Sequence, residues 1–297
     1  MHYKKIFGIT ALTGAILFST ANAAEPVERE TNNQVALLQS LTLGHFDGSI
    51  TVEELKTLGD IGLGTFDGLD GEMIVLDGVV YRAGADLKIN VVEDKVTVPF
   101  ANVTFFEKDF SVKLKNISNK DLLEEKLNSL VDKYGANSFY FVKIDGMFSE
   151  ILIRSEKAQE KPYKTLVQAL EVDQKEKTLY NTYGTIVGLY CPPYMSGLNT
   201  PGWHFHFISV DKTLGGHVLQ LKIKSGEVQF DKTDNFAMRL PKKKSFQKLD
   251  LAQDLSADIQ VSEQGKNLTE TDTDIIPEEI TETETPETDE DIATVEN

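Results

Sequence analysis

Polar and apolar side chains alternate strictly through residues 202–208, which read Gly-Trp-His-Phe-His-Phe-Ile. Because successive side chains of a strand point to opposite faces, this pattern predicts a strand with Trp203, Phe205 and Phe207 facing a core. His204 and His206 then share the opposite face. Further strands are expected at residues 87–92, 95–106, 184–189 and 216–224.

Two Asp-Gly pairs lie between apolar runs and predict hairpins. Asp77-Gly78 separates residues 72–76 from 79–82, and Asp145-Gly146 separates residues 138–144 from 147–154. Asp-Gly favours a two-residue turn because both central residues of a type I′ turn need positive φ.

Helical patterns are few. Thr51 and Glu54 form a capping box that predicts a short helix ending near Gly59. Leucines recur at helical spacing through residues 118–134, and residues 162–176 are expected to form another helix. The chain is therefore predicted to be α+β, with long, largely antiparallel sheets.

The pattern also suggests how the chain is divided. Charged residues cluster near 172–182, between two strand-rich parts. We expect an N-terminal α/β domain at residues 34–175 and a metal-binding domain at residues 176–263. A flexible segment is expected at residues 24–33.

The N-terminal residues resemble an export signal. Lys4 and Lys5 precede an apolar run at residues 6–18, and Ala21-Asn22-Ala23 offers a cleavage site. The apolar run is too short for a permanent membrane span. Residues 1–23 are therefore predicted to be a signal peptide of an exported protein, periplasmic or secreted, without membrane contact after cleavage.

Charge excludes one class of partner. The formal net charge is −17, and no cluster of Lys and Arg suits a phosphate backbone, so we expect no nucleic-acid binding. Residues 267–297 contain 12 acidic residues and no Lys or Arg. The segment at 264–297 is expected to be a disordered acidic tail, because it has little apolar surface to bury.

Three of the five histidines fall between residues 204 and 217. His217 opens the strand that follows His204 and His206, and antiparallel pairing would bring it beside them. Three neutral imidazoles leave a fourth position open, which is typical of catalytic zinc. The alternative is a pair of surface histidines on a strand with an unrelated third.

Longer motifs resemble the alpha-acetolactate decarboxylase family. They are found, in order, at residues 63–74 (LGTFDGLDGEMI), 99–104 (PFANVT), 183–188 (YGTIVG), 201–207 (PGWHFHF) and 215–219 (GGHVL). The resemblance covers roughly residues 34–263 of the chain.

This resemblance implies a fold and a site. The fold would be two α/β domains with mixed sheets, assembled as a homodimer. Zn²⁺ would be bound by His204, His206 and His217. Glu72 and Arg154 would line the site, and Glu263 would match a second glutamate that reaches the metal.

The implied reaction converts 2-acetolactate to acetoin and carbon dioxide without an organic cofactor. Zinc would stabilise the negative charge of the enediolate as a Lewis acid. Arg154 would hold the departing carboxylate or lie near the carbon to be protonated, and Glu72 or Glu263 would handle the hydroxyl proton.

Other interpretations remain open from the residues alone. An exported zinc-dependent protein could bind hydroxy acids without catalysis, or a zinc hydrolase could use Glu72 to activate water. Glu72 could also be a solvated carboxylate on a hairpin, and Arg154 a surface salt-bridge partner.

Overall fold

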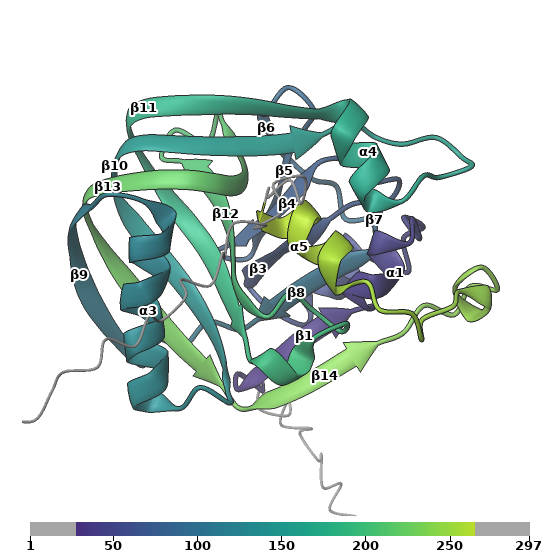
Figure 1. Ribbon diagram of the computed structural model, residues 1–297, viewed down its shortest axis with the longest axis horizontal. Coiled ribbons are helices and arrows are strands. Elements are labelled where there is room, and N and C mark those ends of the chain that lie inside the picture. Colours follow the sequence, from purple (N-terminus) through teal and green to yellow (C-terminus); the bar gives the residue numbers. More distant parts are fainter. Residues whose placement is uncertain (1–27, 265–297) are drawn as a thin grey trace, which may run out of the picture.

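The computed structural model describes residues 28–264 and contains two sheets that pack against each other, with helices at the sides (Figure 1). The predicted signal peptide and the acidic residues from 265 onward lie outside the described part. No helix within residues 28–264 is long and apolar enough to cross a membrane.

The first sheet has seven strands in the order β14-β1-β8-β3-β4-β5-β6. Only the β1–β14 pairing is parallel within it. Its strands are β1 (Thr31–Val35), β3 (Ile61–Thr65), β4 (Glu72–Leu76), β5 (Val79–Ala83), β6 (Ile89–Val91), β8 (Phe100–Thr104) and β14 (Asn235–Arg239). A separate two-stranded sheet joins β2 (Ile50–Thr51) to β7 (Thr97–Val98).

The second sheet has five antiparallel strands in the order β10-β11-β12-β13-β9, and β10 also pairs with β13. Strands β10 to β13 therefore form a closed cycle of hydrogen bonding. The strands are β9 (Phe110–Ile117), β10 (Phe139–Glu156), β11 (Gln174–Cys191), β12 (Gly202–Ser209) and β13 (Gly215–Thr233). Trp203, Phe205 and Phe207 face a core beneath helix α3 (Lys120–Tyr134), which confirms the predicted face.

The local predictions for helices and the first hairpin are confirmed. Helix α2 (Val52–Lys56) starts at the Thr51–Glu54 capping box, and Asn119 caps α3. Asp77 and Gly78 both have positive φ between β4 and β5. The helix expected at residues 162–176 is shorter, α4 (Leu166–Asp173).

The predicted second hairpin is wrong. Asp145 and Gly146 lie inside β10, which continues without a turn. Gly146 is paired with Gly184 in β11 and with Gly226 in β13. A Cβ on Gly146 would lie 2.8 Å from the Ser225 carbonyl oxygen. The glycine is thus required by close backbone approach between long strands, and not by a turn.

Two expected boundaries lie inside strands, 33/34 in β1 and 175/176 in β11. Residues 31–33 belong to β1 because this strand pairs on both sides, with β14 and β8. The expected flexible segment therefore includes the start of a strand. Fourteen residue pairs join β10 to β11 across the expected domain boundary at 175/176. That boundary does not separate two sheets, because one sheet spans it.

Three helices lie together at one end of the molecule. They are α1 (Leu38–Thr42), α4, and α5 (Ser256–Gln264), and Figure 1 places α5 between α4 and α1. Their apolar side chains share one core: Leu38, Leu41, Leu166, Leu170 and Ile259. Two short 3₁₀ helices complete the structure, η1 (Pro193–Met195) and η2 (Phe246–Lys248).

Candidate metal centre

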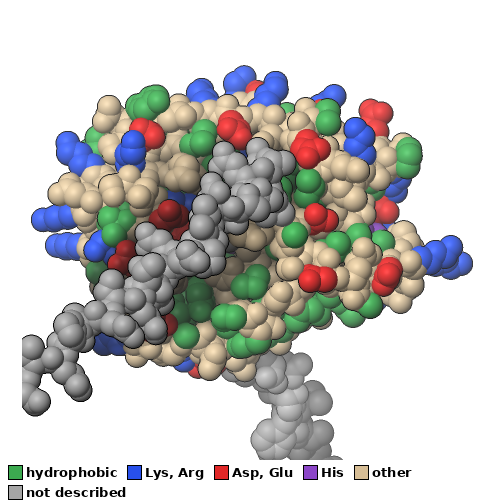
Figure 2. Space-filling model, in the orientation of Figure 1, with side chains coloured by type: hydrophobic (Ala, Val, Ile, Leu, Met, Phe, Trp, Pro, Cys, Tyr) green, Lys and Arg blue, Asp and Glu red, His purple; other side chains and the backbone are tan. Residues whose placement is uncertain are grey.

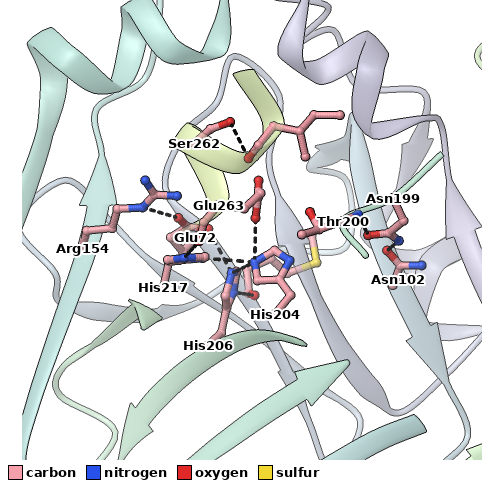
Figure 3. A network of polar contacts seen from close by, with 12 residues as sticks. Glu72, Asn102, Arg154, Asn199, Thr200, His204, His206, His217, Ser262 and Glu263 are labelled. Carbon is pink, nitrogen blue, oxygen red and sulfur yellow. Dashed lines mark hydrogen bonds and ion pairs between the residues drawn. The ribbon is translucent and has the colours of Figure 1, made fainter. Parts of the chain in front are cut away.

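The three predicted histidines meet at one buried point. His206 of β12 is paired with His217 of β13, and His204 lies two residues earlier on the same face. Nε2 of His204 lies 3.0 Å from Nε2 of His206 and 3.1 Å from Nδ1 of His217. Each side chain is at least 92% buried. Figure 3 shows the three rings converging.

Hydrogen bonds fix which ring nitrogens face the centre. Nδ1 of His206 donates to the Met73 carbonyl oxygen at 2.7 Å, and Nε2 of His217 donates to the Glu263 carbonyl oxygen at 2.8 Å. A carbonyl oxygen only accepts, so these nitrogens carry the protons. The inward nitrogens, Nε2 of His206 and Nδ1 of His217, are therefore lone-pair donors suited to a metal.

The remaining contacts fit a cation. Nε2 of His204 lies close to both of these lone pairs, and a single N–H on that nitrogen cannot donate well to two acceptors in different directions. One ion between the rings attracts all three lone pairs. Tetrahedral zinc with bonds of about 2.0–2.1 Å would hold its ligand atoms about 3.3 Å apart, close to the spacing present.

Burial keeps the imidazoles neutral, as metal ligands must be. It lowers the pKa of His204 to about 3. Burial also lowers the pKa of His206 and His217 well below the ordinary value, and the nearby Arg154 charge acts in the same direction.

The three other predicted site residues surround this centre. Glu72 Oε2 lies 3.3 Å from His206 Nε2, and Glu263 Oε2 lies 3.3 Å from His204 Nε2. Arg154 Nε lies 4.0 Å from Glu72 Oε1. Glu72, Arg154 and Glu263 are all buried. The alternatives of a solvated Glu72 and a surface Arg154 are therefore wrong.

Glu156 belongs to the same site and was not anticipated. It follows Arg154 by two residues on β10, is 1% exposed, and lies beside the carboxylate of Glu72. Burial raises its pKa to about 7. Arg154 and Glu156 alternate after an apolar run, which is a strand pattern. The strand was expected to end at residue 154, so Glu156 was not included in the predicted site.

Burial and neighbouring negative charge also act on the two other glutamates. The pKa of Glu72 is raised well above its usual range by burial and by the adjacent Glu156. Burial raises the pKa of Glu263, while the charge of Arg154 opposes that shift. The carboxyl groups thus share one poorly solvated space.

The space itself has a polar floor and an apolar roof. A cavity of about 30 Å³ lies against Glu72, Arg154, Glu156, His204 and Glu263. The roof consists of apolar side chains from α1, α4, the first sheet and the turn before β4, namely Leu38, Leu41, Leu69, Phe100, Leu166 and Leu170. Charged and apolar side chains thus line the same small cavity beside the centre.

A buried amide network supports the strand that carries His204. Asn199 Nδ2 donates to Gln34 Oε1 and Asn102 Oδ1, both at 2.8 Å. Asn102 and Gln34 belong to β8 and β1, so the network connects the first sheet to the loop before β12. Figure 3 places Asn199 and Asn102 beside the histidine cluster.

Known proteins resemble this chain over most of its length. The family model for alpha-acetolactate decarboxylase matches residues 33–253. The alpha-acetolactate decarboxylase of Methanosarcina mazei is 42% identical over 227 residues, which are 76% of this chain and 78% of that protein. The one from Bacillus licheniformis is 35% identical over 242 residues, 80% of this chain and 94% of that protein.

Solved structures agree. The crystal structure of alpha-acetolactate decarboxylase from Bacillus subtilis strain 168 has a TM-score of 0.76 and 34% sequence identity, covering 78% of this chain and 99% of that one. A Staphylococcus aureus protein described as similar to alpha-acetolactate decarboxylase has a TM-score of 0.74 and 28% identity, covering 78% and 100%. The α+β architecture dominated by sheet is common to all three.

Proposed function

Because the chain belongs to the alpha-acetolactate decarboxylase family, we propose that it converts 2-acetolactate to acetoin and carbon dioxide at a zinc ion bound by His204, His206 and His217. The convergence of three neutral, buried imidazoles on one point carries this proposal. Three protein ligands leave a position open for substrate, whereas structural zinc usually has four.

The side chains around the centre suit the reaction. Zinc supplies Lewis-acid stabilisation of the negative charge that develops on the ketone oxygen. Arg154 is the only Lys or Arg that lines the described cavity, so it is the partner for the substrate carboxylate. Glu72 and Glu263 lie close enough to the centre to orient the substrate hydroxyl by hydrogen bonding.

The roof suits the rest of the substrate. Leu38, Leu41 and Leu170 offer an apolar wall to the methyl groups of acetolactate. Closing this wall over the bound substrate would exclude water and strengthen the electrostatic interactions within.

An assay with a metal analysis tests the function. Purified protein should release carbon dioxide and acetoin from 2-acetolactate and contain about one zinc per chain. His206→Ala should lose both zinc and activity. His45→Ala is the matched control, since His45 is also buried but contacts Ser245 and Phe246 and does not line the cavity beside the centre. Full zinc occupancy in His206→Ala would refute the ligand set.

The same assay separates the alternative functions. A zinc-dependent binding protein would bind the hydroxy acid and release no carbon dioxide. A zinc hydrolase would leave acetolactate unchanged and cleave an ester or amide instead. Family membership supports the decarboxylase over both.

Three finer features also belong to the proposal. The basic start and short apolar run support cleavage after Ala23 and export. The resemblance supports a homodimer and a metal-binding C-terminal domain. N-terminal sequencing of the mature protein tests the first feature, and light scattering on the purified protein tests the dimer.

A further inference from the structure

A second cavity lies beside the cavity at the candidate centre. The cavity at the centre, called the inner cavity below, has a volume of about 30 Å³. The second, called the outer cavity, has a volume of about 460 Å³, within the range of about 300–1,000 Å³ that is typical of small-molecule sites. Glu171, Glu176 and Gln220 line the outer cavity and are exposed, so this cavity opens to solvent.

Arg154 and Leu170 line both cavities, and no other described residue does so. Both residues are buried, Arg154 on β10 and Leu170 on α4. Figure 3 shows Arg154 at the edge of the polar network, beside Glu72. A guanidinium in this position can meet a carboxylate that arrives from the outer cavity, with donors that match its charge and its shape.

The floor of the inner cavity continues into the outer cavity. On β10, Glu156 and Arg154 line the inner cavity, and Arg154 and Leu152 line the outer one. These three residues alternate along the strand and therefore share one face. On β13, His217 lines the inner cavity and Leu219 the outer one.

The two helices above the floor also reach both cavities. On α4, Leu166 lines the inner cavity and Val167 the outer one. On α5, Glu263 lines the inner cavity and Val261 the outer one. The same two helices and the same two strands thus enclose both spaces, which makes the cavities two parts of one cleft.

We propose that the outer cavity is the route by which the substrate anion reaches the centre and the product leaves it. This inference rests on the proposed decarboxylase function. Arg154 is the one Lys or Arg among the described residues that line either cavity, so charge draws the carboxylate to the junction. Glu171 and Glu176 oppose this attraction, but they are exposed, so salt screens them more than it screens the buried guanidinium.

Reversible labelling of single cysteines can obstruct this route. Cys191 is the only cysteine and is 1% exposed, so wild-type protein should stay unlabelled. Val167→Cys places a thiol in the outer cavity alone. Val172→Cys is the matched control, because Val172 lies on the same helix, is 66% exposed and lines neither cavity. Benzyl methanethiosulfonate adds a bulky group to either cysteine, and methyl methanethiosulfonate adds a small one.

The probe is 2,3-dihydroxy-2-methylbutanoate, in which a hydroxyl replaces the reactive ketone of acetolactate. The benzyl label on Val167→Cys should slow both association and dissociation of this analogue by about 10-fold or more, because an obstructed route slows passage in both directions. The Kd and the zinc content should stay nearly unchanged. The methyl label should have little effect, and reduction of the disulfide should restore the rates. Relaxation dispersion of the analogue's methyl signals gives the rates, and calorimetry gives the Kd.

Three results would overturn the proposal. They are unchanged rates in benzyl-labelled Val167→Cys, equal slowing in labelled Val172→Cys, and a raised Kd with an unchanged association rate, which would mean that the label disturbs the site itself. If Val167→Cys does not fold, Gln220→Cys replaces it with the same expectations, because Gln220 is exposed and lines the outer cavity from β13.

The proposed function fails separately from this inference. A wild-type protein that binds the analogue by this route but releases no carbon dioxide from acetolactate would refute the decarboxylase alone. A zinc-loaded wild-type protein that does not bind the analogue would overturn the route.

Discussion

Arg154 has a planar, five-donor head that the predicted chemistry uses directly. Its side chain is 4% exposed, and its Nε lies nearest to Glu72. Because lysine offers a point charge and not a fork, Arg154→Lys should lower kcat/KM for acetolactate by about 100-fold, from the loss of a bidentate contact of about 2–3 kcal/mol. Decarboxylation rate, zinc content and melting temperature should be measured together.

Arg239→Lys is a suitable control for this change, because Arg239 is exposed at the end of β14. It should cost at most about 1 kcal/mol of stability and leave the rate unchanged. A fast, zinc-loaded Arg154→Lys enzyme would contradict the role of the fork, and an equally fast Arg154→Ala enzyme would remove Arg154 from the mechanism.

At the residue scale, the sequence predicted the candidate metal ligands because strand alternation places His204 and His206 on one face. Glu72, Arg154 and Glu263 came from the resemblance, and the structure brings all three to the centre. Glu156 could not be recognised because its place in the site depends on burial, which only tertiary packing creates.

Helix α5 links the end of the described chain to the centre. Its Glu263 offers a carbonyl oxygen to His217 and a carboxylate to His204. Truncation after Asp254 removes α5 and should weaken zinc binding by about 10–100-fold, as loss of such supporting contacts typically does. Truncation after Lys266 should change neither zinc binding nor melting temperature, because the acidic tail has no core-forming pattern.

Chelator competition measures the zinc affinity of both truncated proteins. Equal affinities would show that α5 is dispensable for the metal. A large fall in melting temperature on removal of the tail alone would contradict the prediction of a disordered segment.

Aligned glycines set the shape of the second sheet. Gly184 faces Gly146 of β10, and a Cβ on Gly184 would meet Phe207 Cε2 at 2.3 Å and the Ile208 carbonyl oxygen at 2.6 Å. Gly184→Ala should therefore lower the free energy of unfolding by about 1–3 kcal/mol, the usual cost of overpacking.

Gly84→Ala is the matched control, because the nearest atom to its Cβ would be 3.7 Å away. Denaturant unfolding of both variants measures their stability, and equal stability would contradict the packing argument.

The sequence suggested a turn at Asp145-Gly146 because Asp-Gly is a turn signal. The long strands on both sides outweighed that local preference.

Considered as a whole, the molecule carries a buried acid where its two sheets meet. Asp231 of β13 accepts a hydrogen bond from the Glu107 backbone N–H at 3.1 Å, and its Oδ1 has no partner. Burial raises the pKa of Asp231 to about 8. The negative charges of Glu30, Asp109 and Glu107 act in the same direction, while Figure 2 shows acidic and basic side chains mixed over the visible face.

The sign of the resulting pH dependence follows from this raised pKa. The proton on Asp231 stabilises the fold fully below the unfolded pKa of about 3.9, and this contribution is lost as pH rises towards about 8. Asp231→Asn stays neutral, so its stability relative to wild type should increase from pH 5 to pH 8, by on the order of a few kcal/mol.

Urea unfolding at several pH values checks the predicted change in relative stability, with Asp132→Asn as an exposed control on α3. If the free energy of unfolding changed with pH in the same way for wild type and Asp231→Asn, the prediction would be contradicted. The sequence offered no sign of this group, because Asp231 lies in a segment where charged and apolar residues alternate as in any exposed strand.

The α+β class and most strands of the second sheet were predictable from local patterns. The partner strands of β1 could not be predicted, because pairing between residues 31–35 and 235–239 leaves no periodic signal in either segment. The continuity of β10 could not be predicted either, because its partner strand β13 lies far along the chain.

The parallel pairing of β1 with β14 has a consequence for how the chain is made. During synthesis β1 emerges about 200 residues before its outer partner, and helix α5 with Glu263 follows later still. Contacts so distant in sequence close slowly, because the intervening chain must first lose its freedom. The candidate metal centre, which takes side chains from residues 72 to 263, can therefore be completed only after nearly the whole described chain has been made.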